Sequence, residues 1–133
     1  MIGHVVLIDD QIIDQMLFQR VLKRSGLVQK TTPFQYADDA LRYLRGGKTG
    51  RIDAILLDMN MPRMNGLEFL EAATAEFGQN FAGGVFIMLT TPLRPLDRSR
   101  AEAFAIVRGF IDKPVNVASV QTIDAALGDQ TVA

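Results

Sequence analysis

Short apolar runs alternate with helical patterns along the whole sequence, and this alternation limits the fold more than any other feature. Residues 5–8, 54–57 and 85–89 are apolar at every position, and each run is too short for a helix. Strands covered on both faces have this composition, which is typical of a parallel sheet. Two weaker segments, residues 32–36 and 107–111, bring the prediction to five strands.

Apolar residues recur at helical spacing between these runs, which predicts five helices. The predicted helices are marked by Ile13, Met16, Leu17 and Val21; by Ala37, Leu41 and Leu44; by Leu67, Leu70, Ala73 and Phe77; by residues 97–104; and by Val117, Val120, Ile123 and Leu127. Glycine follows the last apolar residue of most of them, as is usual at helix ends.

Strands that alternate with helices predict an α/β fold, a doubly wound five-stranded parallel sheet with right-handed crossovers and five flanking helices. Pro33 cannot donate to a strand ladder and Gly109 packs no side chain, so both are expected in edge strands. The flavodoxin-like strand order 2-1-3-4-5 satisfies this condition. We expect residues 1–133 to form one domain, with a core of about residues 4–128 and no fused output domain.

Composition excludes several classes of function. The chain has no cysteine, which rules out disulfides and thiolate metal sites, and its one histidine, His4, is expected at the surface. A net charge of −1 argues against direct DNA binding. Neither a secretory signal nor an apolar run long enough for a bilayer is visible, so we expect a cytoplasmic protein without membrane contact.

Side chains capable of chemistry follow four of the predicted strands. Asp9 and Asp10 follow the first strand, Asp58 the third, Thr90 the fourth and Lys113 the fifth. Ligands of such sheets bind beyond the carboxyl ends of the strands, so these side chains are expected to form one site. Three neighbouring carboxylates repel one another unless a cation compensates, and a set of oxygen ligands favours Mg²⁺.

A divalent cation beside a carboxylate favours phosphoryl transfer to that carboxylate. Asp58 is the predicted phospho-acceptor, Lys113 neutralises phosphoryl oxygens, and Thr90 donates its hydroxyl to one of them. Taken singly, Asp10 could instead cap the following helix and Asp58 could be an ordinary loop carboxylate.

The same residues carry a resemblance to a known family. Asp9-Asp10, the stretch Asp58-Met59-Asn60-Met61-Pro62-Arg63-Met64-Asn65-Gly66, Thr90 and Lys113-Pro114 together resemble a response-regulator receiver domain, over about residues 4–127. The resemblance implies a Mg²⁺ site made of Asp9, Asp10, Asp58 and the backbone carbonyl of Asn60. It also implies that Phe110 is a switch residue and that the Lys113–Pro114 peptide bond is cis.

By this resemblance, the chain is a single-domain response regulator of a two-component system or phosphorelay. Asp58 would take a phosphoryl group from a histidine kinase or a histidine phosphotransfer protein. The protein would catalyse no reaction other than its own Mg²⁺-dependent phosphorylation and dephosphorylation. Thr90 would then move toward the phosphoryl group, Phe110 would turn inward, and the face around residues 91–112 would bind a separate downstream protein. A phosphorylation-dependent dimer is left open.

Other functions fit the sequence less well. A phosphatase of the haloacid-dehalogenase type needs an Asp-x-Asp loop after the first strand, where this chain has Asp9-Asp10-Gln11. A flavin or nucleotide carrier needs a loop rich in Gly, Ser or Thr at that place. The alternative that stays open is a receiver-like protein-interaction module that works without phosphorylation. The arginines near the fourth helix are read either as a solvated face or as a docking surface: Arg94, Arg98, Arg100 and Arg108.

Overall fold

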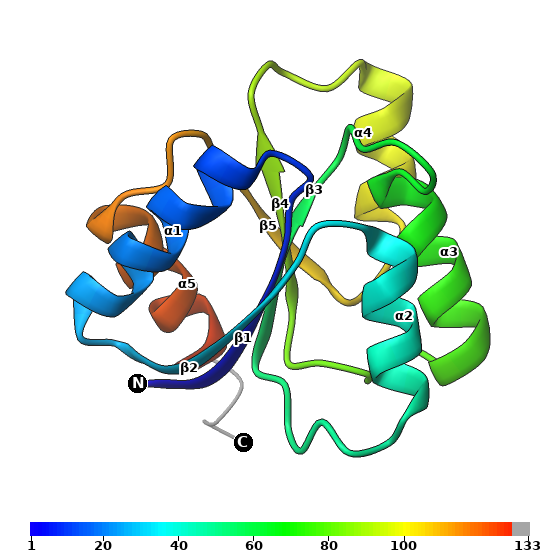
Figure 1. The fold of residues 1–133 in the computed structure, drawn as a ribbon. Helices are drawn as coiled ribbons and strands as arrows, with labels where there is room; N and C mark the ends of the chain where they lie inside the picture. Colours follow the sequence, from blue (N-terminus) through cyan, green and yellow to red (C-terminus); the bar gives the residue numbers. More distant parts are fainter. Residues whose placement is uncertain (129–133) are drawn as a thin grey trace.

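The computed structural model describes residues 1–128, and within them five parallel strands and five helices alternate (Figure 1). The sheet has the order β2-β1-β3-β4-β5. Its strands are β1 (Ile2–Ile8), β2 (Val28–Phe34), β3 (Ala54–Asp58), β4 (Val85–Leu89) and β5 (Val107–Asp112). The predicted fold class and strand order are confirmed.

The helices form one layer on each side of the sheet (Figure 1). On one side lie α1 (Ile12–Ser25) and α5 (Val117–Gly128), and on the other lie α2 (Ala37–Arg45), α3 (Gly66–Phe77) and α4 (Pro95–Glu102). Each layer encloses its own apolar core, so β3 and β4, in the middle of the sheet, are buried at every position. No helix among the described residues is both long and apolar enough to cross a bilayer.

The register of the central strands places their carboxyl ends side by side. Ile8 of β1 pairs with Leu57 of β3, and Leu57 pairs with Ile87 of β4. The residues that follow these positions therefore leave the sheet at one edge. This alignment brings residues far apart in the sequence to a common site.

The edge positions of Pro33 and Gly109 are confirmed, because β2 and β5 are the outer strands. The predicted bounds of β2 are wrong, since the strand begins at Val28 and the chain leaves it before Tyr36, which is the N-cap of α2. An edge strand carries a weak apolar pattern, and the three residues after Val28 are polar. Helix α4 likewise begins at Pro95 rather than at residue 97, because proline is well tolerated at the first helical position.

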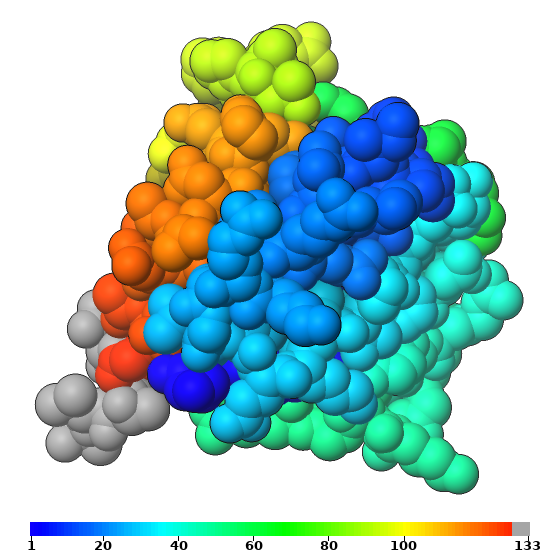
Figure 2. Space-filling view, turned by 60° about the vertical axis from the view of Figure 1, so that its left-hand side comes forward, coloured from blue at the N-terminus to red at the C-terminus, as the bar shows by residue number. Residues whose placement is uncertain are grey.

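The predicted helix is confirmed as α1, but most of the apolar residues that marked it do not face the core. Its core contacts come from Gln15, Phe18 and Leu22. Ile13, Met16 and Leu17 are 74%, 52% and 48% exposed on the outer side of the helix, which crosses the face shown in Figure 2. Periodicity located the helix, but both stripes repeat at helical spacing and only the packed sheet selects between them.

His4 is buried, contrary to the expectation of a surface residue. Its ring meets the ring of Tyr43 on α2 edge to face, with centroids 6.5 Å apart. Its Nε2 atom lies 2.7 Å from the Thr32 hydroxyl oxygen on β2. An unpaired imidazole is costly in a core, so this hydrogen bond is what makes the buried position tolerable.

Candidate functional site

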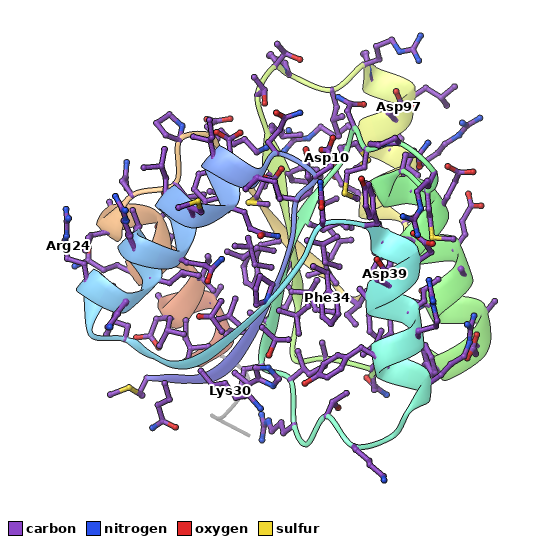
Figure 3. The ribbon with its side chains drawn as sticks, in the orientation of Figure 1. Asp10, Arg24, Lys30, Phe34, Asp39 and Asp97 are labelled. Carbon is purple, nitrogen blue, oxygen red and sulfur yellow. The ribbon has the colours of Figure 1, made fainter. Side chains whose placement is uncertain are left out.

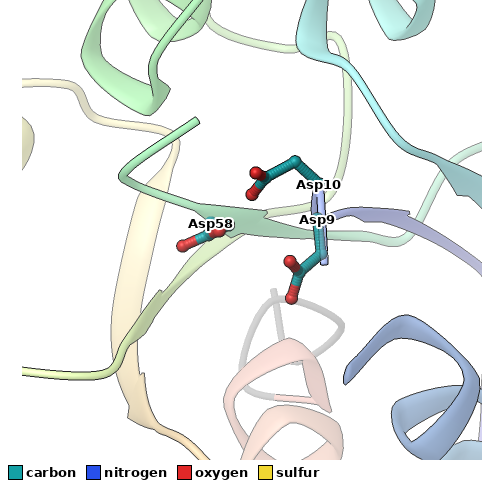
Figure 4. A group of neighbouring side chains, drawn as sticks. All are labelled: Asp9, Asp10 and Asp58. Atoms are coloured by element: carbon teal, nitrogen blue, oxygen red, sulfur yellow. The ribbon is translucent and has the colours of Figure 1, made fainter. Parts of the chain in front are cut away.

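Three carboxylates meet at the carboxyl edge of the sheet. Asp9 and Asp10 come from the end of β1 and Asp58 from the end of β3 (Figure 4). One oxygen of each lies within 4.8 Å of the others. Figure 3 shows Asp10 at this edge, with Lys30 near the opposite end of the sheet. The tertiary structure thus groups the three aspartates that the sequence singled out.

Asp9 is fully buried and fixed by several hydrogen bonds. Its Oδ1 accepts from the backbone N–H of Gln11 at 2.9 Å, and its Oδ2 accepts from Lys113 Nζ at 3.0 Å. The amide of Gln15 donates to the backbone oxygens of Asp9, at 3.3 Å, and Phe34, at 2.9 Å. Gln15 therefore supports the site from α1, and the sequence reading missed it. Its place on the same helical face as Phe18 and Leu22 was the available signal.

Lys113 connects the carboxylates electrostatically. Its Nζ atom lies 3.6 Å from Asp58 Oδ1 and 3.7 Å from Asp14 Oδ2, in addition to the bond to Asp9. Burial by itself lowers the pKa of Lys113, but the hydrogen bond to Asp9 and the charge of Asp58 outweigh it and raise that pKa. Lys113 therefore stays charged, and Asp14 is a further site neighbour that sequence reasoning did not identify.

Asp58 has a perturbed carboxyl group. Burial is the largest cause and raises its pKa to about 6; Lys113 counteracts this increase, whereas Asp9 and Asp10 add to it. A carboxylate that is costly to ionise gains from any additional positive charge nearby. The site therefore favours binding of a cation.

One carboxylate oxygen of Asp10 is buried without a hydrogen-bond partner in the part of the chain that the structure describes. Among the described residues, its Oδ1 is one of the few buried side-chain oxygens without a hydrogen-bond partner. It does not cap α1, because the N-cap residue is Gln11, whose side chain makes no cap hydrogen bond. Three carboxylates with an orphaned acceptor oxygen fit a hard divalent cation such as Mg²⁺.

The loop between β3 and α3 is held in a defined conformation after Asp58. Asn65 and Glu68 form a capping box at the start of α3. A Cβ atom on Gly66 would lie 3.0 Å from the Asp58 carbonyl oxygen and 2.9 Å from Met59 Sδ, so the close turn requires glycine. Asn60 is exposed in this loop. The start of α3 is therefore held close to the backbone of Asp58 and Met59, where the loop begins.

Arg63 ties the same loop to α2. Its guanidinium pairs with Asp38 and lies 4.1 Å above the Tyr36 ring. Its φ of 69° places it in the left-handed region that ordinary residues rarely adopt. The contacts with α2 therefore hold a strained position.

The remaining predicted residues lie on β4, β5 and the segments after them. Thr90 directly follows β4 and is exposed, and Phe110 is half-buried on β5, opposite Ile87 in the register. The Lys113–Pro114 peptide bond is cis, as the resemblance implies. All five chemistry-bearing residues are thus at the carboxyl edge of the sheet.

The sequence matches the response regulator receiver domain family over residues 5–123. A protein-glutamate methylesterase/protein-glutamine glutaminase of Anaeromyxobacter dehalogenans is 36% identical over 57% of this chain and 20% of its own length. A protein described as a two-component response regulator, ARR13 of Arabidopsis thaliana, is 30% identical over 84% of this chain and 18% of its own. The chain spans about a fifth of the length of these curated relatives.

Solved structures of similar proteins align with nearly the whole chain. A two-component response regulator from Cytophaga hutchinsonii is 25% identical with a TM-score of 0.86, covering 96% of this chain and 98% of that one. One from Legionella pneumophila is 27% identical with a TM-score of 0.77, covering 96% and 98%. The chemotaxis protein CheY4 of Vibrio cholerae shares the fold at 23% identity and a TM-score of 0.75, covering 95% and 99%.

Members of the matched family are signalling modules of two-component systems, and they generally bind Mg²⁺ in an acidic pocket like the one formed here by Asp9, Asp10 and Asp58. Because the match spans residues 5–123 and the fold agrees with it throughout, the chain belongs to the response regulator receiver domain family.

Proposed function

We propose that Asp58 accepts a phosphoryl group from the phosphohistidine of a histidine kinase or a histidine phosphotransfer protein. The observation that carries this proposal is the grouping of Asp9, Asp10 and Asp58 within 4.8 Å, with Lys113 held among them. Three carboxylates with one buried cation have an excess of negative charge. That excess suits a divalent ion and, through it, a phosphoryl group.

The transfer exchanges one bond for another. An ionised oxygen of Asp58 attacks phosphorus, the bond from phosphorus to the donor's imidazole nitrogen breaks, and the imidazole leaves with the bonding electron pair. Asp58 thereby becomes an aspartyl phosphate. Its pKa of about 6 means that most of it is ionised at neutral pH. The nucleophile is therefore ready without a general base.

Other residues position the phosphoryl group and neutralise its charge. Lys113 lies 3.6 Å from Asp58 Oδ1, close enough for its ammonium group to contact a phosphoryl oxygen. Thr90 supplies a hydroxyl from the end of β4. Asp9, Asp10, Asp58 and the Asn60 carbonyl would hold Mg²⁺, which when bound neutralises charge on the transferring group.

The proposed output is a change in the face around residues 91–112. Phosphorylation adds about −1.5 to −2 charges beside Thr90 and Lys113. Thr90 moves toward the new oxygens, and Phe110 on the neighbouring strand turns into the space that it leaves. A shift at β4 and β5 thus changes the surface next to α4, where a downstream protein binds.

The test is incubation with acetyl phosphate and Mg²⁺, followed by mass spectrometry of the intact protein. The wild type should gain the mass of one phosphoryl group, and Asp58→Asn should gain none. Asp39→Asn, which removes a carboxylate on α2, is the matched control and should react as the wild type does. An unmodified wild type would overturn the proposal in favour of a phosphorylation-independent interaction module, and an equal adduct on Asp58→Asn would exclude Asp58 as the acceptor.

A further inference from the structure

The switch residue of the proposed mechanism is covered by a charged side chain from another element. The guanidinium carbon of Arg98, on α4, lies 4.1 Å from the centroid of the Phe110 ring on β5. This distance is well inside the range in which a cation is attracted to an aromatic face. The two residues join α4 to the outer strand of the sheet, on the side of the apolar core that α4 covers.

Glu102 fixes the position of the arginine. Its Oε1 accepts a hydrogen bond from Arg98 Nε at 2.8 Å, and the two residues are one helical turn apart on α4. The carboxylate therefore limits the rotamers of a long and otherwise mobile side chain. Holding Arg98 in advance reduces the entropy cost of its contact with the ring.

We propose that Arg98, held by Glu102, is a positioning residue that stabilises Phe110 in the conformation of the unphosphorylated protein. This inference rests on the proposed function, in which Phe110 moves toward the space beside Thr90. Moving the ring away separates it from the guanidinium, so the contact exists in only one of the two states. An interaction made in one state shifts the equilibrium toward that state by its own free energy.

The exposure of Arg98 and Phe110 sets how far their contact shifts the equilibrium between the two states. Arg98 is exposed and Phe110 is half-buried. A cation over an aromatic ring at such a site contributes about 0.5–1 kcal/mol, which corresponds to about a 2- to 5-fold change in the equilibrium. By linkage, the same factor applies to the affinity for a phosphoryl group or its analogue.

The first measurement is the apparent dissociation constant of beryllofluoride, a phosphoryl analogue, in saturating Mg²⁺. Arg98→Ala should bind it about 2- to 5-fold more tightly than the wild type. Arg98→Lys should lie between the two, because an ammonium keeps part of the attraction. Arg100→Ala, an exposed position on the same helix, should equal the wild type. Binding by Arg98→Ala that is equal to or weaker than that of the wild type would overturn the proposal.

A second measurement tests the positioning of Phe110 by Arg98 directly, in protein without a phosphoryl analogue. Three-bond couplings to the Phe110 ring carbon report its side-chain rotamer populations by NMR. In Arg98→Ala the population of the wild-type rotamer should fall, and in Glu102→Gln it should fall by less. If the rotamer responds while the wild type does not bind beryllofluoride, the proposed function fails and the positioning by Arg98 stands. Unchanged populations in Arg98→Ala would refute the positioning itself.

Discussion

Lys113 Nζ lies 3.0 Å from Asp9 Oδ2, and the two side chains are only 9% and 0% exposed. A buried ion pair of this kind requires both partners, because either charge left alone is poorly solvated. The pair joins the ends of β1 and β5, which are not neighbours in the sheet. Lys113 therefore acts on the stability of the whole carboxyl edge as well as on its charge.

Replacing this lysine should destabilise the protein strongly. Lys113→Met leaves Asp9 buried without its cation, and we expect a loss of about 3 kcal/mol in the free energy of unfolding. The measurement is urea denaturation at pH 7.5 without divalent ions. Lys23→Met, an exposed position on α1, is the control and should change stability by less than about 0.5 kcal/mol. Similar values for the two variants would show that the buried pair contributes nothing.

Neutralising Asp58 should stabilise the metal-free protein. Its pKa is raised from 3.8 to about 6, so the folded state binds a proton more readily than the unfolded chain does. The free energy of unfolding therefore falls as the pH rises from about 4 to about 6, and the penalty persists at higher pH. At pH 7.5, Asp58→Asn should be more stable than the wild type by about 2–3 kcal/mol.

The control for this prediction is how the difference in unfolding free energy between Asp58→Asn and the wild type changes with pH and with Mg²⁺. Near pH 4 the gap should shrink to about 0.5 kcal/mol, because Asp58 is then protonated in the folded protein and close to half-protonated in the unfolded chain. Mg²⁺ should stabilise the wild type more than the variant and so narrow the gap. A variant that is no more stable than the wild type at pH 7.5 would contradict the prediction.

His4 should make stability depend on pH in the opposite direction. Burial, and then the charge of Lys30 on β2, lower its pKa below 6.5; a backbone hydrogen bond at Arg51 and the charge of Asp53 only partly offset this decrease. The unfolded chain thus binds a proton more readily than the folded protein. The free energy of unfolding should fall as the pH drops below about 6.5.

This effect is best measured in an Asp58→Asn background, which removes the opposing titration. Unfolding free energies at pH 7.5 and pH 5.5 should differ more with His4 present than in a His4→Gln variant. The comparison uses the pH slope, so a uniform loss of stability in His4→Gln does not affect it. Equal slopes would mean that His4 does not titrate differently in the two states.

Arg63 should respond differently to two small substitutions. Arg63→Ala loses the contacts with Asp38 and Tyr36 and keeps an unfavourable positive φ, whereas Arg63→Gly loses the contacts and relieves the backbone. We expect the glycine variant to be more stable than the alanine variant by about 1 kcal/mol, as measured by urea denaturation. The reverse order would show that the loop abandons the left-handed conformation once the arginine is removed.

The alternation of apolar runs and helical patterns predicted the parallel sheet, and the strand order 2-1-3-4-5 agrees with its edge positions. Residues 54–57 and 85–89 are short and apolar throughout, which predicts strands buried on both faces, and Pro33 and Gly109 favour edge strands. Once the order is fixed, geometry requires Asp9, Asp10, Asp58, Thr90 and Lys113 to leave the sheet at the same edge. Local sequence therefore carried this part of the prediction.

The tertiary structure alone decided which surfaces face inward. Ile13, Met16 and Leu17 are as apolar as core residues, yet Gln15, Phe18 and Leu22 face the sheet. The burial of His4 depends on Thr32 and Tyr43, which are distant in sequence. The stacking of Arg98 on Phe110 likewise depends on how α4 meets β5. Sequence periodicity specifies that an element has two faces, whereas the free energy of packing against distant residues selects the buried one.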